Sequence, residues 1–285
     1  MTSATRAGPE HRVLRFVQAF AADPVEALLY LPEEASKHRE HPVDFDVDVS
    51  WEEHLHGLLR APWPCPQAER ATQLWAAVAE ELRELGLAFG RHTYGSYSDA
   101  DESLARAAWC TVRHSRPVMV VETGVARGVI SRVILEALAE NDRGRLWSVD
   151  LPYPFERGLH NQTGIAVPDR LRSRWTYVEG SSRRRLPGLV KELGQVDMFV
   201  HDSLHTARNT RFEMEQIAGV LAPGGIMLVD DISTHQGFAP WTRVPGMADA
   251  LVCPSADHEG LFGVVRTSTA VRAAHFPRHH LTTRS

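Results

Sequence analysis

Three carboxylates follow two short apolar runs in the C-terminal half of the chain. Asp202 closes the run DMFVHD, and Asp230 and Asp231 close the run IMLVDD. Ligands bind at the carboxyl ends of parallel strands, and clustered carboxylates repel one another unless a cation or proton joins them. Oxygen ligands suit Mg²⁺, Mn²⁺ or Ca²⁺, so these acids form a candidate metal site. The alternative is that they only cap helices, as Asp202 could for a helix near Thr206.

Two histidines follow these acids closely in the sequence. His205 lies three residues beyond Asp202, and His235 lies four beyond Asp231. A neutral imidazole near pH 7 is a suitable general base, so Asp202, His205 and His235 are the catalytic candidates. His201 is the weakest histidine, because neighbours in a strand point to opposite faces. A solvated or helix-capping role is the alternative for each histidine.

A glycine-containing turn lies upstream of these residues, in VMVVETGVARG at positions 118–128. It follows an apolar run and precedes residues at helical spacing, so its free N–H groups and positive dipole would suit an anionic ligand. Asp150 ends the next apolar run, where nucleotide-binding folds place an acid against ribose hydroxyls. Ala126 replaces the middle glycine of GxGxxG, which disfavours NAD and its pyrophosphate.

Short apolar runs alternate with helical patterns from about residue 117 onward. We expect parallel strands at 118–122, 146–151, 175–180, 197–202 and 226–231, a helix at 206–221, and a turn at 223–225. Two further strand-like runs, 248–252 and 261–266, suit an antiparallel pair at the sheet edge. The predicted fold is α/β: a Rossmann-like, seven-stranded, mainly parallel sheet with helices on both faces.

The N-terminal third lacks this alternation. Apolar residues at 13–20 and 74–85 suit amphipathic helices, with an irregular, acidic and proline-rich stretch at 42–66 between them. We expect residues 1–93 to form a helical cap or oligomerisation region, beside a cofactor-binding domain at 94–285. A homo-oligomer, dimer or larger, follows as an expectation.

Composition limits the class of protein. The 285 residues carry a net charge of −5, which gives no sign of nucleic-acid binding, and we read the basic cluster at 183–185 as a solvated helix start. Three distant cysteines without a CxxC pair argue against a disulfide framework or a zinc–thiolate site. Neither a signal peptide nor a membrane span is evident, so a cytoplasmic protein is expected.

Four segments resemble a known family. ETGVARG, SVDLP, HDSLHT and LAPGGIMLVDDI, in this order, are similar to bacterial class I S-adenosylmethionine-dependent methyltransferases, in the group that includes antibiotic and sugar O-methyltransferases. The resemblance spans about residues 94–266. It implies a cofactor site with the methionine end near Glu122, ribose at Asp150 and adenine beside Gly180. The implied cofactor-binding residues are Glu122, Thr123, Gly124, Gly128, Asp150, Leu151, Gly180, Ser181 and Asp202.

The resemblance also implies a reaction. Metal-dependent O-methyltransferases with a similar Asp-Asp pair bind Mg²⁺, which would hold two substrate oxygens and lower the pKa of the attacking hydroxyl. We therefore expect methyl transfer from S-adenosylmethionine to a hydroxyl of a small molecule, with natural-product tailoring as one setting. A non-catalytic cofactor-binding regulatory or scaffold protein is the alternative. A nicotinamide-dependent oxidoreductase is disfavoured by Ala126 and by the lack of an evident Tyr-x-x-x-Lys pair.

Several segments are candidates for acceptor binding. The stretch at 152–168 is long, contains two glycines and follows the ribose acid, as a lid or acceptor loop would. Tyr94, Tyr97, Trp109 and Trp241 could line a substrate pocket or belong to the core.

Overall fold

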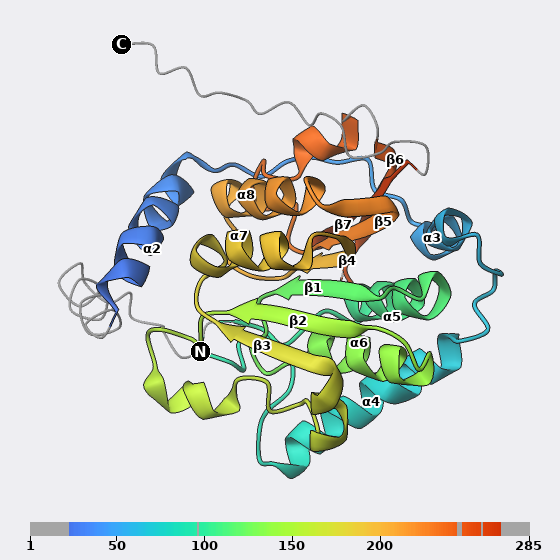
Figure 1. The fold of residues 1–285 in the computed structure, drawn as a ribbon, viewed down its shortest axis with the longest axis horizontal. Coiled ribbons are helices and arrows are strands. Elements are labelled where there is room, and N and C mark those ends of the chain that lie inside the picture. The colour runs from blue at the N-terminus through green and yellow to red at the C-terminus, as the bar shows by residue number, and fades with distance from the viewer. Residues whose placement is uncertain (1–22, 96, 244–246, 258, 269–285) are drawn as a thin grey trace.

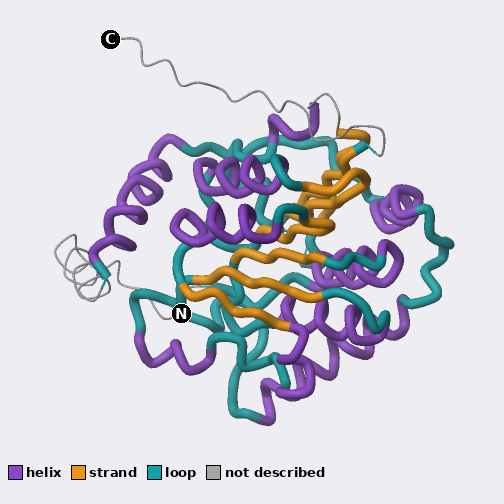
Figure 2. The backbone as a smooth tube through the Cα atoms, in the orientation of Figure 1, coloured by secondary structure: helices purple, strands orange, loops and turns teal. Residues whose placement is uncertain are grey.

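A seven-stranded sheet forms the centre of the molecule (Figures 1 and 2). The computed structural model describes residues 23–95, 97–243, 247–257 and 259–268. The strand order is β3-β2-β1-β4-β5-β7-β6. The strands are β1 (Met119–Thr123), β2 (Arg145–Asp150), β3 (Trp175–Glu179), β4 (Val196–His201), β5 (Leu221–Val229), β6 (Met247–Pro254) and β7 (Leu261–Thr267).

The pairing confirms the predicted mainly parallel sheet with an antiparallel pair at one edge. Strands β1 to β5 pair in parallel, and β7 runs antiparallel to both β5 and β6. The turn expected at 223–225 is instead part of β5. There the pairing with β4 jumps from Leu221 to Ile226, so the Pro-Gly-Gly segment is accommodated as an irregularity within the strand. The strand ends at Val229, and Asp230 and Asp231 lie just beyond it.

Helices cover both faces of the sheet (Figure 1). Alternate strand residues point to opposite faces: Val120 and Met198 join the cluster under α3 to α6, whereas Val121 and Phe199 join the cluster under α7 and α8. The helices are α2 (Pro24–Ser36), α3 (Trp51–Leu59), α4 (Ala68–Glu84), α5 (Glu102–Ser115), α6 (Val129–Glu140), α7 (Ser182–Leu193) and α8 (Ala207–Ala218). Short 3₁₀ turns are η1 (Lys37–Arg39), η2 (Arg157–Gln162), η3 (Asp169–Arg174) and η4 (Ala239–Arg243).

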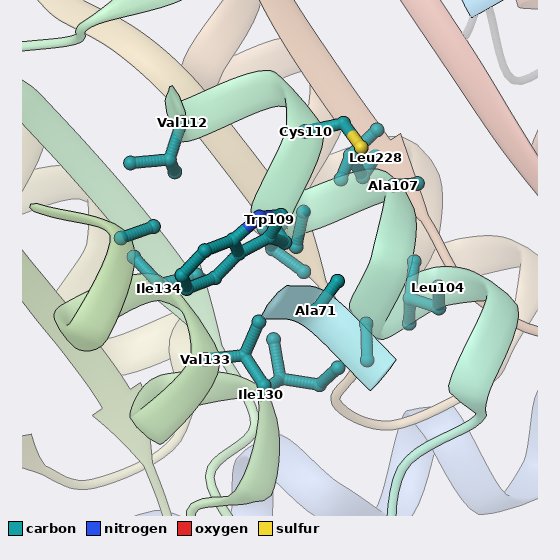
Figure 3. Packing of buried hydrophobic residues seen from close by; sticks show 14 of the residues in the cluster. Ala71, Leu104, Ala107, Trp109, Cys110, Val112, Ile130, Val133, Ile134 and Leu228 are labelled. Atoms are coloured by element: carbon teal, nitrogen blue, oxygen red, sulfur yellow. The ribbon is translucent and has the colours of Figure 1, made fainter. Parts of the chain in front are cut away.

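Trp109 of α5 lies at the centre of the larger cluster. Its fully buried ring packs among Ala71 of α4 and Val133 and Ile134 of α6 (Figure 3), so it belongs to the core and not to a pocket wall. Trp241 is likewise buried, in the second cluster. Helices on both sides of the predicted boundary at residue 93 contribute to the first cluster, although the division itself stays a prediction.

The N-terminal part wraps around the edge of the sheet. Helix α2 lies beside α7 and α8, and the chain then crosses the molecule to α3 (Figure 1). On this path the Val43 N–H donates to the Ser233 carbonyl at 3.0 Å, and the Asp48 N–H to the Val252 carbonyl at 2.8 Å. The stretch at 42–66 was expected to be irregular, but it includes the helix α3. The helix predicted at 13–20 lies outside the described residues, and none of the described helices has the length and apolarity to cross a membrane.

Candidate active site

The turn after β1 brings three strand ends into close contact. Gly124 has a φ of +84°, and a Cβ there would lie 1.9 Å from the carbonyl oxygen of Asp202. The Gly124 N–H donates to the Val149 carbonyl, and the Asp202 N–H donates to the Thr123 carbonyl, both at 2.9 Å. Only glycine combines this conformation with so close an approach. The residue type thus sets how tightly β1, β2 and β4 converge.

Asp150 lies at the end of β2 and faces the turn. Its Oδ2 accepts the N–H of Ala126 at 3.3 Å, and the side chain lines the main cavity. Burial raises the pKa of Asp150 to about 7, although hydrogen bonds from Ala126 and Val125 oppose the shift. A carboxyl group at this position can accept hydrogen bonds from ribose hydroxyls, as the sequence predicts.

Glu122 lies behind the turn and not in the cavity wall. Its Oε2 accepts hydrogen bonds from the Ser131 and Ser148 hydroxyls, each at 2.6 Å, and the side chain is fully buried. Burial raises the pKa of Glu122 to about 8, against the effect of both serines. Glu122 therefore ties β1 to β2 and α6. Its predicted position at the methionine end of the cofactor stays a prediction.

A cavity of about 790 Å³ opens above these strand ends, within the usual size range for small-molecule sites. Five of the predicted cofactor-binding residues line it: Gly124, Asp150, Leu151, Ser181 and Asp202. The other four, which do not line it, are Glu122, Thr123, Gly128 and Gly180. The cavity thus joins the turn, the end of β2 and the segment after β3, and the cofactor-binding roles of all nine residues stay predictions.

Aromatic side chains form another part of the cavity wall. Tyr153, from the predicted acceptor loop, packs edge-on against Tyr97 with ring centroids 5.2 Å apart. Tyr94 lies on the same side, 6.1 Å from Tyr153, and Tyr30 of α2 also lines the cavity. Such rings offer flat apolar surface with polar edges. This wall suits a planar or aromatic ligand.

Two acids and a histidine converge on the cavity rim. Asp202, His205 and Asp230 each offer a ligand atom, and these atoms lie within 4.8 Å of one another. His205 Nε2 lies 3.6 Å from Asp202 and 4.0 Å from Asp230, and has no hydrogen-bond partner among the described residues. Asp231 instead contacts His205 Nδ1 at 2.8 Å. The group therefore contains His205 where the sequence analysis placed Asp231.

The protonation states of this rim group depend on one another. Burial raises the pKa of Asp230 well above its ordinary value, and the charge of Asp202 adds to the effect. Burial disfavours the charged form of His205, but contacts with Asp202 and Asp231 outweigh it and raise the pKa of His205. The hydrogen bond from His205 lowers the pKa of Asp231. A proton on Asp230, an imidazolium or a bound cation would each relieve the repulsion between these acids.

A buried polar network supports the rim from below. Glu213 of α8 accepts hydrogen bonds from the Thr123 hydroxyl, His201 Nδ1 at 2.6 Å, the Ser203 hydroxyl at 2.7 Å and the Asn209 amide at 2.8 Å. Burial opposes ionisation of Glu213, but the charge of His201 and its hydrogen bond outweigh burial and lower the pKa of Glu213 to about 2. Thr123 and His201 therefore fix the ends of β1 and β4 to α8.

His235 does not reach the rim. Its ring is fully buried, with Nε2 3.3 Å from the Thr210 hydroxyl and Nδ1 accepting the Gly237 N–H at 3.1 Å. Burial lowers the pKa of His235 to about 4. Both ring nitrogens are engaged within the protein, so this histidine is not positioned as a base for a substrate in the cavity.

Helix α2 closes one side of the cavity, which sequence reasoning missed. Glu26 accepts the N–H of Ser181 at 3.2 Å, and Glu33 pairs with Arg183 at 2.7 Å. The basic cluster expected to be solvated thus holds α2 in place, with Arg184 pairing to Glu26 at 3.4 Å. The available signal was two acids seven residues apart, which lie on one face of a helix.

Arg127 is a second residue that sequence reasoning missed. It is buried within the turn after β1, donates to the Ala88 carbonyl at 2.6 Å and to the Thr93 carbonyl, and pairs with Asp99 at 3.4 Å. Gln162 accepts a further hydrogen bond from it at 3.0 Å. Arg127 therefore fastens the segment before α5 and the loop after β2 over the turn.

The fold is the Rossmann-like fold of methyltransferases, as the sequence predicts. Residues 121–232 match the family model described as a methyltransferase domain. No curated protein matches the sequence.

Solved structures share the fold at low sequence identity. One is a putative O-methyltransferase from Klebsiella pneumoniae, with a TM-score of 0.51 and 14% identity over 77% of this chain and 97% of that one. An O-methyltransferase from Bacillus cereus, solved with SAH, has a TM-score of 0.52 and 11% sequence identity, over 77% of this chain and 98% of that one. TomG from Streptomyces achromogenes, an O-methyltransferase of tomaymycin synthesis solved with SAM, has a TM-score of 0.51 and 13% sequence identity, over 77% of this chain and 96% of that one.

Proposed function

We propose that this protein transfers a methyl group from S-adenosylmethionine to a hydroxyl group of a small molecule, with natural-product tailoring as one setting. One observation carries the proposal. A single cavity is lined by the Gly124 turn and Asp150 and also by the rim group Asp202, His205 and Asp230. The candidate cofactor-binding residues and the candidate acid–base residues therefore line the same cavity. The aromatic wall favours a planar acceptor such as a phenol or catechol.

The proposed reaction needs a group that accepts the hydroxyl proton, and it needs the acceptor oxygen in line with the carbon–sulfur bond of the cofactor. The acceptor O–H loses its proton to a rim group, the oxygen attacks the sulfonium methyl carbon, and the carbon–sulfur bond breaks with its electron pair going to sulfur. The products are a methyl ether and S-adenosylhomocysteine. Holding the two reactants in line supplies much of the rate. Tyr153 and Tyr97 would orient the acceptor ring, and Asp150 would hold the ribose.

The rim group also fits a divalent cation. Two carboxylates face His205 Nε2, which forms no hydrogen bond within the described part of the chain, and Asp231 accepts from the other ring nitrogen, as partners of metal-bound histidines do. We propose that Asp202, His205 and Asp230 would hold the ion, with Mg²⁺ or Mn²⁺ as candidates. A bound ion would supply Lewis-acid stabilisation of the acceptor oxyanion. Asp231 keeps the imidazole oriented in either case.

Formation of S-adenosylhomocysteine on a panel of catechols, phenols and sugars tests this function. Asp230→Asn should retain cofactor binding but lose most turnover, because it weakens the rim group without touching the ribose contact. Asp169→Asn, at a fully exposed position in η3, is the matched control and should behave like the wild type.

Two outcomes would contradict the proposal. A folded protein that binds S-adenosylmethionine but methylates no acceptor would favour the regulatory or scaffold alternative. Unchanged turnover in Asp230→Asn, with and without chelator, would remove both the rim group and the cation from the mechanism.

A further inference from the structure

Two histidines and two cysteines meet away from the active-site cavity. His56 belongs to α3, Cys65 to the segment before α4, and Cys110 and His114 to α5. Ligand atoms of His56, Cys65 and Cys110 lie within 4.8 Å of one another, and His114 Nε2 lies 3.5 Å from the Cys65 sulfur. Cysteines that are far apart in the sequence are thus neighbours in the fold.

We propose that these four residues, the Cys₂His₂ cluster, bind a thiophilic divalent cation, with Zn²⁺ as the preferred ion. Paired cysteine and histidine ligands are a common structural zinc set. The ion would join α3 and the segment before α4 to α5, which packs against the sheet. The proposal concerns a site separate from the cavity and does not depend on the proposed reaction.

The distances within the cluster suit a tetrahedral ion. Zinc–sulfur bonds of ~2.3 Å and zinc–nitrogen bonds of ~2.0 Å place two sulfurs about 3.8 Å apart, and a sulfur and a nitrogen about 3.5 Å apart. The Cys65 and Cys110 sulfurs are 3.7 Å apart, and Cys65 and His114 are 3.5 Å apart. Two of the six edges of a tetrahedral site are therefore already formed.

The hydrogen bonding of His56 is a second, independent observation that points to a bound ion. Its ring is almost fully buried, and Nδ1 lies 2.6 Å from the Glu52 carbonyl, so Nδ1 carries the proton. In the neutral ring Nε2 is then the acceptor, and no described residue forms a hydrogen bond of normal geometry with it, although the cluster brings Cys65 close to the ring. A buried acceptor without a partner is unfavourable. A hydrogen bond from the remote ring nitrogen to a backbone carbonyl is the usual arrangement of a metal-bound histidine.

A backbone hydrogen bond favours a thiolate at Cys65. The Gln67 N–H donates to the Cys65 sulfur at 3.4 Å. Two thiolates and two neutral imidazoles cancel the charge of a divalent ion, so the complex buries no net charge.

Cys110 and His114 share one face of α5, because residues four apart are neighbours on a helix. The side chains of Cys110 and Trp109 leave α5 in different directions, so the core packing of Trp109 does not occupy the cluster (Figure 3). His114 is only partly buried, which leaves its ring room to adjust as the fourth ligand. It also gives an ion a path from solvent.

Titration of the reduced, chelator-treated full-length protein with Co²⁺ tests the proposal. One equivalent should produce visible absorption of tetrahedral Co²⁺ and near-ultraviolet thiolate-to-cobalt charge transfer, and Zn²⁺ should displace both. Because Asp202, His205 and Asp230 provide no thiolate, binding at the rim cannot give the charge-transfer band. Cys65→Ala and Cys110→Ala should lose the band, whereas Cys253→Ala, at the buried cysteine of β6, should keep it.

The wild-type titration alone decides the matter if a cysteine variant does not fold. Absence of the charge-transfer band from folded, reduced protein would overturn the proposal, as would an unchanged band in Cys65→Ala. A Cys65–Cys110 disulfide in the isolated protein that returns on air exposure and excludes Co²⁺ would assign the pair to redox chemistry instead. His114→Gln, at the partly exposed ligand, should shift the band and weaken Co²⁺ binding at least tenfold.

Discussion

Gly124→Ala tests how closely the ends of β1, β2 and β4 approach one another at the turn after β1. A Cβ at this position would lie 1.9 Å from the Asp202 carbonyl oxygen, on backbone with a φ of +84°. A left-handed conformation costs an L-residue ~1–2 kcal/mol, and overpacking costs ~1–3 kcal/mol. We therefore expect a loss of about 2–5 kcal/mol in the free energy of unfolding. Because the carbonyl belongs to the rim residue Asp202, cofactor affinity should fall as well.

Urea denaturation measures this loss, since a lower midpoint with an unchanged slope reports stability alone. Gly188→Ala is the matched control: it lies within α7, and a Cβ there meets no atom within 4 Å. It should be neutral or stabilise the protein by up to ~1 kcal/mol, through helix propensity. If Gly124→Ala keeps both the wild-type midpoint and the wild-type cofactor affinity, the close approach of β1 and β4 is wrong.

Three further predictions concern the charged groups around the cavity. Asp150→Asn should weaken S-adenosylmethionine binding about 10- to 100-fold by calorimetry, since a hydrogen bond to a charged group contributes ~1.5–3 kcal/mol; equal affinity would exclude the ribose contact. Glu213→Gln should lower the free energy of unfolding by about 3 kcal/mol near pH 7. The pKa of Glu213 falls from 4.5 to about 2 on folding, and each pKa unit corresponds to ~1.4 kcal/mol. That contribution is present above pH 4.5 and is lost as the pH falls toward 2, so a difference in stability that stays constant across this range would contradict it. Glu33→Gln leaves Arg183 without its buried partner and should speed hydrogen exchange in α2 but not in the strands; unchanged exchange in α2 would show that this pair does not hold the helix.

Strong local patterns made the sheet predictable. Apolar runs such as 118–122 and 226–231 contain too few polar residues to be exposed strands, and their alternation with helical segments required parallel pairing. The same patterns placed Asp150, Asp202 and Asp230 at strand ends, and therefore at one edge of the sheet. The Pro-Gly-Gly segment was misread because local turn residues do not reveal an irregularity that the partner strand β4 accommodates.

The remaining features depend on contacts between distant segments. The spacing of Glu26 and Glu33 indicates one face of a helix, but it does not identify their partners Arg183 and Arg184, which are more than a hundred residues away. His235 was predicted at the rim because it lies only four residues after Asp231, but its ring is buried and bonds within the protein. Cys65 and Cys110 looked unrelated because they are 45 residues apart in the sequence. The expected homo-oligomer and cytoplasmic location stay predictions.

Calorimetric titration of the wild-type protein with S-adenosylmethionine tests the central claim most directly. The cavity above Gly124 and Asp150 predicts one binding site per chain, with S-adenosylhomocysteine competing for it. NADH should not bind, because Ala126 leaves no glycine to accommodate a pyrophosphate. Folded protein that gives no binding signal with S-adenosylmethionine, or that binds NADH in its place, would contradict the account.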